Sequence, residues 1–340
     1  MTGGDRLPNS TNVQRLTAAI RVEPRPLSRP FRFAHAAIER VDLVHLDLIG
    51  EGTVGEGEIA AGIDHGQNPI MIADEARKLS SVVARQGRLD VAGLTAVLRE
   101  NEIQASGPAR LLVEMAYLDL LAKDAAVPVW HLLGLPPPRN IRLVRTVPLD
   151  EEFPERQRPL KVKLGGPDDE RILGRLSAVP GPIILDVNRG WGRAEWLRFR
   201  EAVQAIAPAV LEDPVSDEEL LPEIRAALLG TAVVLDEGIE GMADVEHAST
   251  IADGANVKLM RFGGILPAAE ALDTLREADA TTMLGCYLEP PRAIAYAAQL
   301  AGLCDWTDLD GHFWLTDDAA TSAYRLDSSR PGIPEISYTV

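Results

Sequence analysis

Short apolar runs rich in β-branched residues recur along the second part of the chain and alternate with stretches rich in Ala, Leu, Glu and Arg. The runs have the length of strands, and the stretches between them have the length of helices. Such alternation predicts a parallel sheet, and eight strands predict that the sheet closes into a barrel. The predicted strands are 141–148, 160–164, 183–188, 208–212, 232–236, 255–259, 281–285 and 306–309.

An open, doubly wound sheet is the alternative arrangement of the same elements. Neither GxGxxG nor GxxxxGK[ST] follows any predicted strand, so its nucleotide-binding signatures are missing. Little chain remains for a regular helix after the last strand. The sequence therefore predicts an α/β fold with a modified (β/α)7β barrel of the TIM type.

The first part of the chain has a different pattern. Polar and apolar residues alternate over 41–48, which predicts an antiparallel sheet within residues 17–58 that has one face in solvent. Apolar positions then recur at helical spacing within 68–134, and the helical region ends at Gly134 before a run of prolines.

These patterns divide the chain into three parts. We predict an α+β capping domain over 1–134 that begins with a flexible lead, a barrel over 135–310, and a C-terminal segment over 311–340 that completes the capping domain. The β-like residues 336–340 are expected to return to the N-terminal sheet.

The composition is that of an acidic globular protein. The 340 residues include 34 Lys and Arg against 51 Asp and Glu, so the formal net charge is −17. This charge, without a basic stripe, argues against nucleic acid binding. No apolar run has the length of a membrane span, and the N-terminus lacks a signal-peptide pattern. We expect a cytoplasmic protein with no nucleic acid or membrane partner.

Ionisable residues stand at the ends of successive predicted strands. Lys161 and Lys163 lie in the second strand, and the ends of the next four carry Asp186, Glu212, Asp236 and Lys258. Counted from Lys163, the intervals are 23, 26, 24 and 22 residues. Each interval has the length of a strand, a helix and two loops, so these side chains should meet at one rim of the barrel.

The two lysines share one face of their strand, because side chains alternate along a strand. For an isolated pair, two solvated lysines would be the simpler interpretation. The flanking apolar residues and the position at a strand end favour a site inside the barrel. Mutual repulsion and partial burial should then lower a lysine pKa from about 10.4 towards roughly 7–8, which suits a general base.

The three carboxylates are candidate metal ligands. Each alone could cap the helix that follows its strand. Three oxygen donors on three successive strands suit Mg²⁺, which keeps positions open for water or a substrate carboxylate. We therefore predict a magnesium site on Asp186, Glu212 and Asp236.

Lys258 lies on the sixth predicted strand, across the barrel from the second. A substrate above the metal would meet Lys163 on one face and Lys258 on the other. This arrangement fits removal and return of a proton at one carbon, with the metal stabilising the enediolate formed next to a carboxylate.

These motifs resemble the muconate-lactonizing branch of the enolase superfamily. The resemblance covers nearly the whole chain and rests on Lys161-Val162-Lys163, Asp186-Val187-Asn188, Leu211-Glu212-Asp213-Pro214, Asp236-Glu237 and Asn256-Val257-Lys258. It implies Mg²⁺ on Asp186, Glu212 and Asp236, and acid/base roles for Lys163 and Lys258. It also implies that Lys161 is an electrostatic partner near the substrate carboxylate and that the protein is a homo-oligomer.

Asp308-Leu309-Asp310 on the eighth strand resembles the DxD motif of dipeptide epimerases, in which the pair holds the free ammonium group of the dipeptide. Two carboxylates on one face of a strand end make a cation site. A polar turn before Gly311 is the alternative interpretation of the motif. Thr146 also matches the family pattern, and it and Cys286 are further candidate substrate contacts.

One departure concerns specificity. Ala-Glu epimerases have an arginine for the glutamate side chain where this chain has Ala36, which puts that specificity in doubt. Arg29, Arg32 and His35 are candidate substitutes, although Arg32 could equally face solvent.

The resulting hypothesis is an isomerase, a Mg²⁺-dependent dipeptide epimerase that acts at the α-carbon of the C-terminal residue. A cycloisomerase, an o-succinylbenzoate synthase or an N-acylamino-acid racemase is the alternative on the same scaffold. A non-catalytic binding protein is a third possibility, but binding alone does not need two opposed lysines. The preferred dipeptide is not readable from the sequence.

Overall fold

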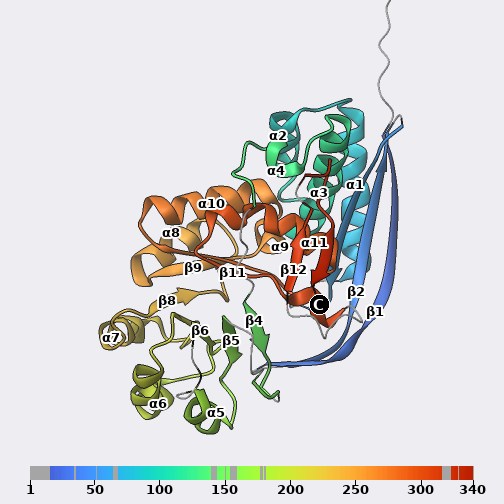
Figure 1. Ribbon diagram of the computed structural model, residues 1–340. Coiled ribbons are helices and arrows are strands. Elements are labelled where there is room, and N and C mark those ends of the chain that lie inside the picture. Colours follow the sequence, from blue (N-terminus) through green and yellow to red (C-terminus); the bar gives the residue numbers. More distant parts are fainter. Residues whose placement is uncertain are drawn as a thin grey trace, which may run out of the picture.

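Two units of structure are visible in the computed structural model, a barrel and an α+β unit beside it (Figure 1). The structure describes residues 16–339 except 34–35, 51, 64–67, 139–143, 150, 154–158, 177–178, 180, 316–322 and 328. The predicted flexible lead, 1–15, and the first residues of the first predicted barrel strand, 141–143, lie outside the described residues.

The N-terminal unit is an antiparallel sheet with helices packed on one side. Its strands β1 (Thr17–Phe33), β2 (Ala36–Ile49) and β3 (Val54–Ala61) follow each other in the order β1-β2-β3. The helices are α1 (Pro69–Arg85), α2 (Val91–Glu100), α3 (Gly107–Asp124) and α4 (Val129–Leu132). The long β1–β2 hairpin extends from this unit towards the barrel strand β4 (Figure 1). The predicted sheet and the predicted helical region are both confirmed.

Helix α3 packs against β3 because two glycines allow a close approach. A Cβ atom on Gly55 would lie 2.0 Å from the Ala116 carbonyl oxygen, and one on Gly57 would lie 2.6 Å from the Leu112 carbonyl oxygen. The two glycines are two residues apart, so they face the same side of the strand. Nearly all of α3 is buried as a result, including Leu112 and Ala116.

The barrel is one eight-stranded sheet in the order β11-β10-β9-β8-β7-β6-β5-β4, in which every described neighbour pair is parallel. The Val144 N–H donates to the Thr307 carbonyl oxygen at 3.2 Å and joins the first strand to the last. The strands are β4 (Arg145–Val147), β5 (Leu160–Lys163), β6 (Ile183–Asp186), β7 (Val210–Glu212), β8 (Ala232–Leu235), β9 (Gly254–Val257), β10 (Thr281–Gly285) and β11 (Trp306–Asp308). The predicted barrel is confirmed.

Helices connect successive strands from β5 onwards and cover the barrel from outside (Figure 1). They are α5 (Asp169–Leu176), α6 (Arg193–Ile206), α7 (Leu221–Ala227), α8 (Met242–Ile251), α9 (Leu259–Phe262), α10 (Ile265–Glu277) and α11 (Pro291–Ala297), with 3-10 turns η1 (Glu218–Leu220) and η2 (Ala298–Leu303). The last strand is followed by the 3-10 turn η3 (Gly311–Trp314).

The interior of the barrel has an apolar floor and a polar rim. The floor is a separate buried cluster of Val144, Ile184, Val210, Val234 and Met283. Four of these floor residues are followed, two positions later and on the same face, by a polar residue. These polar residues are Thr146, Asp186, Glu212 and Asp236. All four side chains are buried. The period of two along each strand therefore places one hydroxyl and three carboxyl groups above the apolar floor.

The prediction for the end of the chain was wrong in one detail. Strand β13 (Ile336–Thr339) pairs with β12 (Ala323–Leu326) and, within the described residues, not with the N-terminal sheet. The pattern of 336–340 indicates a strand but not its partner, and β12 is the nearer partner along the chain. The segment between them does contact α3, because the Ile333 N–H donates to Asp119 Oδ1 at 2.8 Å.

Candidate active site

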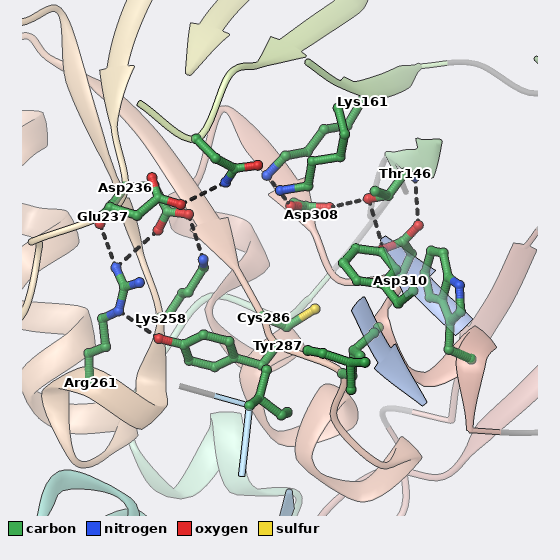
Figure 2. A pocket seen from close by; sticks show the side chains of 18 residues that line it. Thr146, Lys161, Asp236, Glu237, Lys258, Arg261, Cys286, Tyr287, Asp308 and Asp310 are labelled. Carbon is green, nitrogen blue, oxygen red and sulfur yellow. Dashed lines mark hydrogen bonds and ion pairs between the residues drawn. The ribbon is translucent and has the colours of Figure 1, made fainter. Parts of the chain in front are cut away.

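A cavity of about 290 Å³ opens where the carboxyl ends of the barrel strands meet the capping unit. Figure 2 shows two polar ends of this cavity. Asp236, Lys258 and Arg261 lie at one end, and Thr146, Asp308 and Asp310 lie at the other.

Lys161 is surrounded by carboxylates. Its Nζ lies 2.9 Å from Asp186 Oδ2, 2.8 Å from Glu212 Oε2 and 2.7 Å from Asp308 Oδ2, and the side chain is only 2% exposed. One ammonium group therefore holds together the strands β6, β7 and β11 at the rim.

The other two lysines each contact one predicted metal ligand. Lys163 Nζ donates to Asp186 Oδ2 at 2.6 Å, and Lys258 Nζ donates to Asp236 Oδ2 at 2.6 Å. Lys163 ends β5 and Lys258 follows β9. These strands are four places apart in the eight-stranded sheet, so the two ammonium groups approach the cavity from opposite walls.

The lowering of a lysine pKa that was expected for the adjacent pair is wrong for Lys161. Burial opposes the charged form of Lys161, but Asp186, Asp308 and Glu212 outweigh it and raise the pKa well above its usual value. Burial likewise opposes the charge on Lys258, and Asp236 raises its pKa overall. The sequence shows the repulsion between neighbouring lysines, but not how many carboxylates surround each one.

The three predicted metal ligands are buried together. Asp186 and Glu212 are fully buried register partners on β6 and β7, and Asp236 is 2% exposed. Burial and the charge of Asp186 raise the pKa of Glu212 to about 8. Despite its burial, Asp236 has a lowered pKa because Lys258 and Arg261 contact it.

This donor set fits a hard divalent cation, because it consists of carboxylate oxygens that repel each other in a buried place. Among the described residues, no three Asp, Glu, His or Cys side chains are arranged around one point so that they could coordinate a metal ion. Lys161 lies between Asp186 and Glu212 and neutralises them, while Lys258 and Arg261 neutralise Asp236. Asp213 fixes the backbone here, because its Oδ2 accepts hydrogen bonds from the Asp236 N–H at 3.0 Å and from the Glu237 N–H.

Thr146, Asp308 and Asp310 form one hydrogen-bonded group at the other end. Asp310 Oδ2 accepts a hydrogen bond from the Thr146 N–H at 2.7 Å, and the Thr146 hydroxyl contacts both aspartates at 3.2–3.3 Å. Both carboxylates line the cavity. Burial and the charge of Asp308 raise the pKa of Asp310 to about 7. A cation that entered this end would therefore relieve a repulsion between two carboxylates.

Cys286 also lines the cavity, between the two ends (Figure 2). Burial and the charge of Asp308 raise the pKa of its thiol well above the usual value. The thiol is therefore a neutral wall group. All the sequence-predicted site residues except Asp186 and Glu212 contribute to the cavity lining, and these two lie directly behind it on Lys161 and Lys163.

Sequence reasoning missed Arg261 and Tyr287. Arg261 Nη1 lies 3.1 Å from Asp236 Oδ1, and its Nε donates to the Tyr287 hydroxyl at 2.7 Å. The Tyr287 ring centroid lies 4.9 Å from Lys258 Nζ. One feature of the sequence could have pointed to Arg261. It is a charged residue among the apolar, buried residues of 259–262, three positions after Lys258.

Two of the three candidate substitutes for the missing arginine, Arg29 and Arg32, do not line the cavity. Arg29 pairs with Glu151 Oε2 at 2.8 Å, and Arg32 is exposed. His35 lies outside the described residues, and the side chain of Ala36 is not described. In the part of the chain that the structure describes, we find no helix with the length and hydropathy that a membrane span needs.

Two family models match the chain and together cover most of it. The model "Mandelate racemase / muconate lactonizing enzyme, N-terminal domain" matches residues 16–134, and the model "Enolase C-terminal domain-like" matches residues 152–329. The chain belongs to the enolase superfamily. This membership confirms the resemblance drawn from the sequence motifs.

Curated members of the superfamily with similar sequences include epimerases. An L-Ala-D/L-amino acid epimerase from Pedosphaera parvula is 31% identical over 79% of this chain and 81% of its own length. A hydrophobic dipeptide epimerase from Roseobacter litoralis is 29% identical over 89% of this chain and 94% of its own length. Among proteins of known structure, the L-Ala-D/L-Glu epimerase from Bacillus subtilis superposes with a TM-score of 0.80 over 96% of this chain and 100% of its own, at 20% identity. The last comparison supports the fold.

Proposed function

We propose that this protein is an isomerase, a Mg²⁺-dependent dipeptide epimerase that removes and returns the α-proton of the C-terminal residue. The observation that carries the proposal is the pair of lysines on opposite walls of one cavity, Lys163 on β5 and Lys258 after β9. A carbon held between them is open to proton transfer on both faces. The epimerase names of the similar curated proteins support the same reaction class.

Asp186, Glu212 and Asp236 would hold the Mg²⁺ ion. When bound, the ion supplies positive charge that stabilises a substrate carboxylate as negative charge develops on it. It would also neutralise the three carboxylates and so weaken their ion pairs with the lysine ammonium groups. This would allow Lys163 and Lys258 to reach the proton donor and acceptor states that the reaction needs.

Each lysine has one role in one direction of the reaction. One of Lys163 and Lys258 takes the α-proton as the neutral amine, and the other donates a proton to the opposite face as the ammonium. Lys161 keeps its charge beside Asp308, which lies 2.7 Å from its Nζ and is not one of the metal ligands. Its positive charge at the rim favours binding of the substrate carboxylate.

The free ammonium group of the dipeptide would bind to Asp308 and Asp310. Asp308 is shared with Lys161, at 2.7 Å, whereas the hydrogen bonds of Asp310 to Thr146 leave its charge without a lysine contact in the described residues. Asp310 is therefore the main ammonium ligand in this proposal. N-acylated substrates lack this charge, which separates dipeptides from the substrates of the alternative racemases.

The test is α-proton exchange across a library of L,L-dipeptides in heavy water with Mg²⁺, read by mass spectrometry. We expect one deuterium at the α-carbon of the C-terminal residue and formation of the L,D epimer. A panel of N-acylamino acids serves as the comparison, and the double variant Lys163→Ala, Lys258→Ala is the control for contaminating enzymes. No deuterium in any dipeptide would contradict the proposal. Exchange in the N-acylated panel alone would favour a racemase of that class.

Other predictions from the sequence stay predictions. They are the division at residues 134 and 310, a cytoplasmic location and a homo-oligomeric assembly.

A further inference from the structure

One wall of the cavity is apolar and comes from both units of the protein. The capping unit contributes Phe31, Ile38 and Ile63, and the segments after β10 and β11 contribute Leu288 and Trp314. All five belong to the apolar cluster that includes Val41, Leu43, Ala60, Phe313 and Leu315. The wall is therefore the inner surface of a packed cluster rather than a set of separate side chains.

The β1–β2 register sets which side chains face the cavity. Phe31 and Ile38 are direct partners across the hairpin, so their side chains share one face of the sheet. The next pair, Arg32 and Ala37, faces the other way and is exposed. Alternation along the two strands thus directs an apolar pair into the cavity and the arginine out of it.

Trp314 is fixed beside the ammonium end of the cavity. Its ring lies edge-on to Phe31, with centroids 4.9 Å apart. The guanidinium carbon of Arg145, the neighbour of Thr146 in the chain, lies 5.1 Å from the Trp314 ring centroid. Asp310 is four residues before Trp314, and its carbonyl oxygen accepts a hydrogen bond from the Phe313 N–H at 3.0 Å. The backbone turn that carries Trp314 is therefore tied to Asp310, and Phe31 packs on Trp314.

Among the described residues that line the cavity, none on the apolar wall offers a positive countercharge to an acidic side chain. Arg145 and Arg29 lie 5.1 Å and 5.5 Å from the Trp314 centroid, but neither lines the cavity, and Arg29 pairs with Glu151. The cations that do line the cavity are Lys161, Lys163, Lys258 and Arg261, and each contacts a carboxylate of the site. An acidic side chain at this wall would also be repelled by Asp308 and Asp310.

We propose that the Phe31–Ile38–Trp314 wall selects dipeptides whose N-terminal residue has an apolar side chain. This inference rests on the proposed function, because Asp308 and Asp310 locate the N-terminal ammonium group and hence the side chain next to it. Apolar complementarity of one side chain discriminates between substrates by roughly 10–200-fold. Leucine or phenylalanine at the N-terminal position should therefore exceed glutamate by at least about 10-fold in kcat/KM.

The experiment compares two series of dipeptides, L-Xaa-L-Ala and L-Ala-L-Xaa, with Xaa as Leu, Phe, Glu or Lys. Three variants are measured with the wild type: Ile38→Arg, Phe31→Ala, and Arg32→Ala as the matched control from the opposite face of the hairpin. The readout is a ratio of two kcat/KM values in one preparation, so partial misfolding cancels. Ile38→Arg should raise the ratio of L-Glu-L-Ala to L-Leu-L-Ala by at least about 10-fold, and Phe31→Ala should lower the preference for L-Leu-L-Ala. Arg32→Ala should change neither ratio.

Two results would overturn the inference and leave the proposed function intact. One is turnover of L-Glu-L-Ala at least as fast as that of L-Leu-L-Ala in the wild type. The other is discrimination that appears only in the L-Ala-L-Xaa series, or that is unchanged in both wall variants. Turnover of no dipeptide in either series would overturn the proposed function and this inference with it.

Discussion

Replacing Asp310 by Asn removes one negative charge from the ammonium end of the cavity and keeps the size of the side chain. Asp310 Oδ2 accepts from the Thr146 N–H at 2.7 Å, and the amide oxygen of Asn can accept the same bond. The change also removes the repulsion between Asp308 and Asp310, which burial makes stronger. We therefore expect the melting temperature of Asp310→Asn at about pH 8 to equal or exceed that of the wild type.

The catalytic effect should be a loss. A hydrogen bond to a charged group contributes about 1.5–3 kcal/mol. This corresponds to a decrease of roughly 10–150-fold in kcat/KM for a dipeptide with a free ammonium group. An N-acetylated dipeptide has no ammonium group, so its residual turnover should not decrease in the variant.

The pH profile gives an independent readout. Burial and the neighbouring Asp308 raise the pKa of Asp310 to about 7. Only the carboxylate attracts the ammonium group, so kcat/KM of the wild type should fall as the pH drops through about 7. Asp310→Asn carries no titrating group at this place and should lack this part of the fall.

The assay is deuterium incorporation at the α-carbon, measured for the free and the N-acetylated dipeptide in each enzyme. Asp273→Asn, at an exposed aspartate on α10, is the control for a general effect of removing a charge. The assignment of Asp310 to the ammonium group is refuted if the free and the N-acetylated dipeptide lose the same factor, or if neither loses any.

Two further predictions concern stability. Mg²⁺ should raise the melting temperature, and at 100 times Kd the added stability should be about 2.7 kcal/mol. In a thermal denaturation assay, Glu212→Gln should reduce this shift. An equal shift in both proteins would argue against the predicted ligand set. Burial raises the pKa of Glu114 to about 7, while the unfolded chain releases the proton near the ordinary value of 4.5. The free energy of unfolding should therefore fall by roughly 3 kcal/mol between about pH 4 and pH 8. In denaturant titrations, Glu114→Gln should lack this part of the fall. The same pH dependence in both proteins would contradict the assignment of this fall to Glu114.

The barrel could be predicted because its signals are local. Each strand is an apolar run buried on both sides, as in Ile183–Asp186, and the ionisable residue at its end repeats at the interval of one βα unit. The residues above the apolar floor follow from alternation along a strand. This is why the sequence alone predicts that Asp186, Glu212 and Asp236 share one rim.

The features that the sequence did not reveal depend on contacts between distant segments. Phe31 and Trp314 form one wall although they come from opposite ends of the chain, and no local pattern links them. The direction of the lysine pKa shifts depends on the number of carboxylates around each Nζ, which only the assembled rim defines. The partner of β13 was missed for a similar reason, because a strand pattern does not specify its neighbour.

The central claim is that Lys163 and Lys258 act on opposite faces of one α-carbon. The most direct test measures α-proton exchange in heavy water for the L,L and the L,D epimer of one dipeptide, in Lys163→Ala and in Lys258→Ala. We predict that each variant loses epimerisation but still exchanges the proton of one epimer, and that the two variants retain opposite epimers. Exchange of both epimers by either variant, or retained epimerisation, would contradict the two-base account.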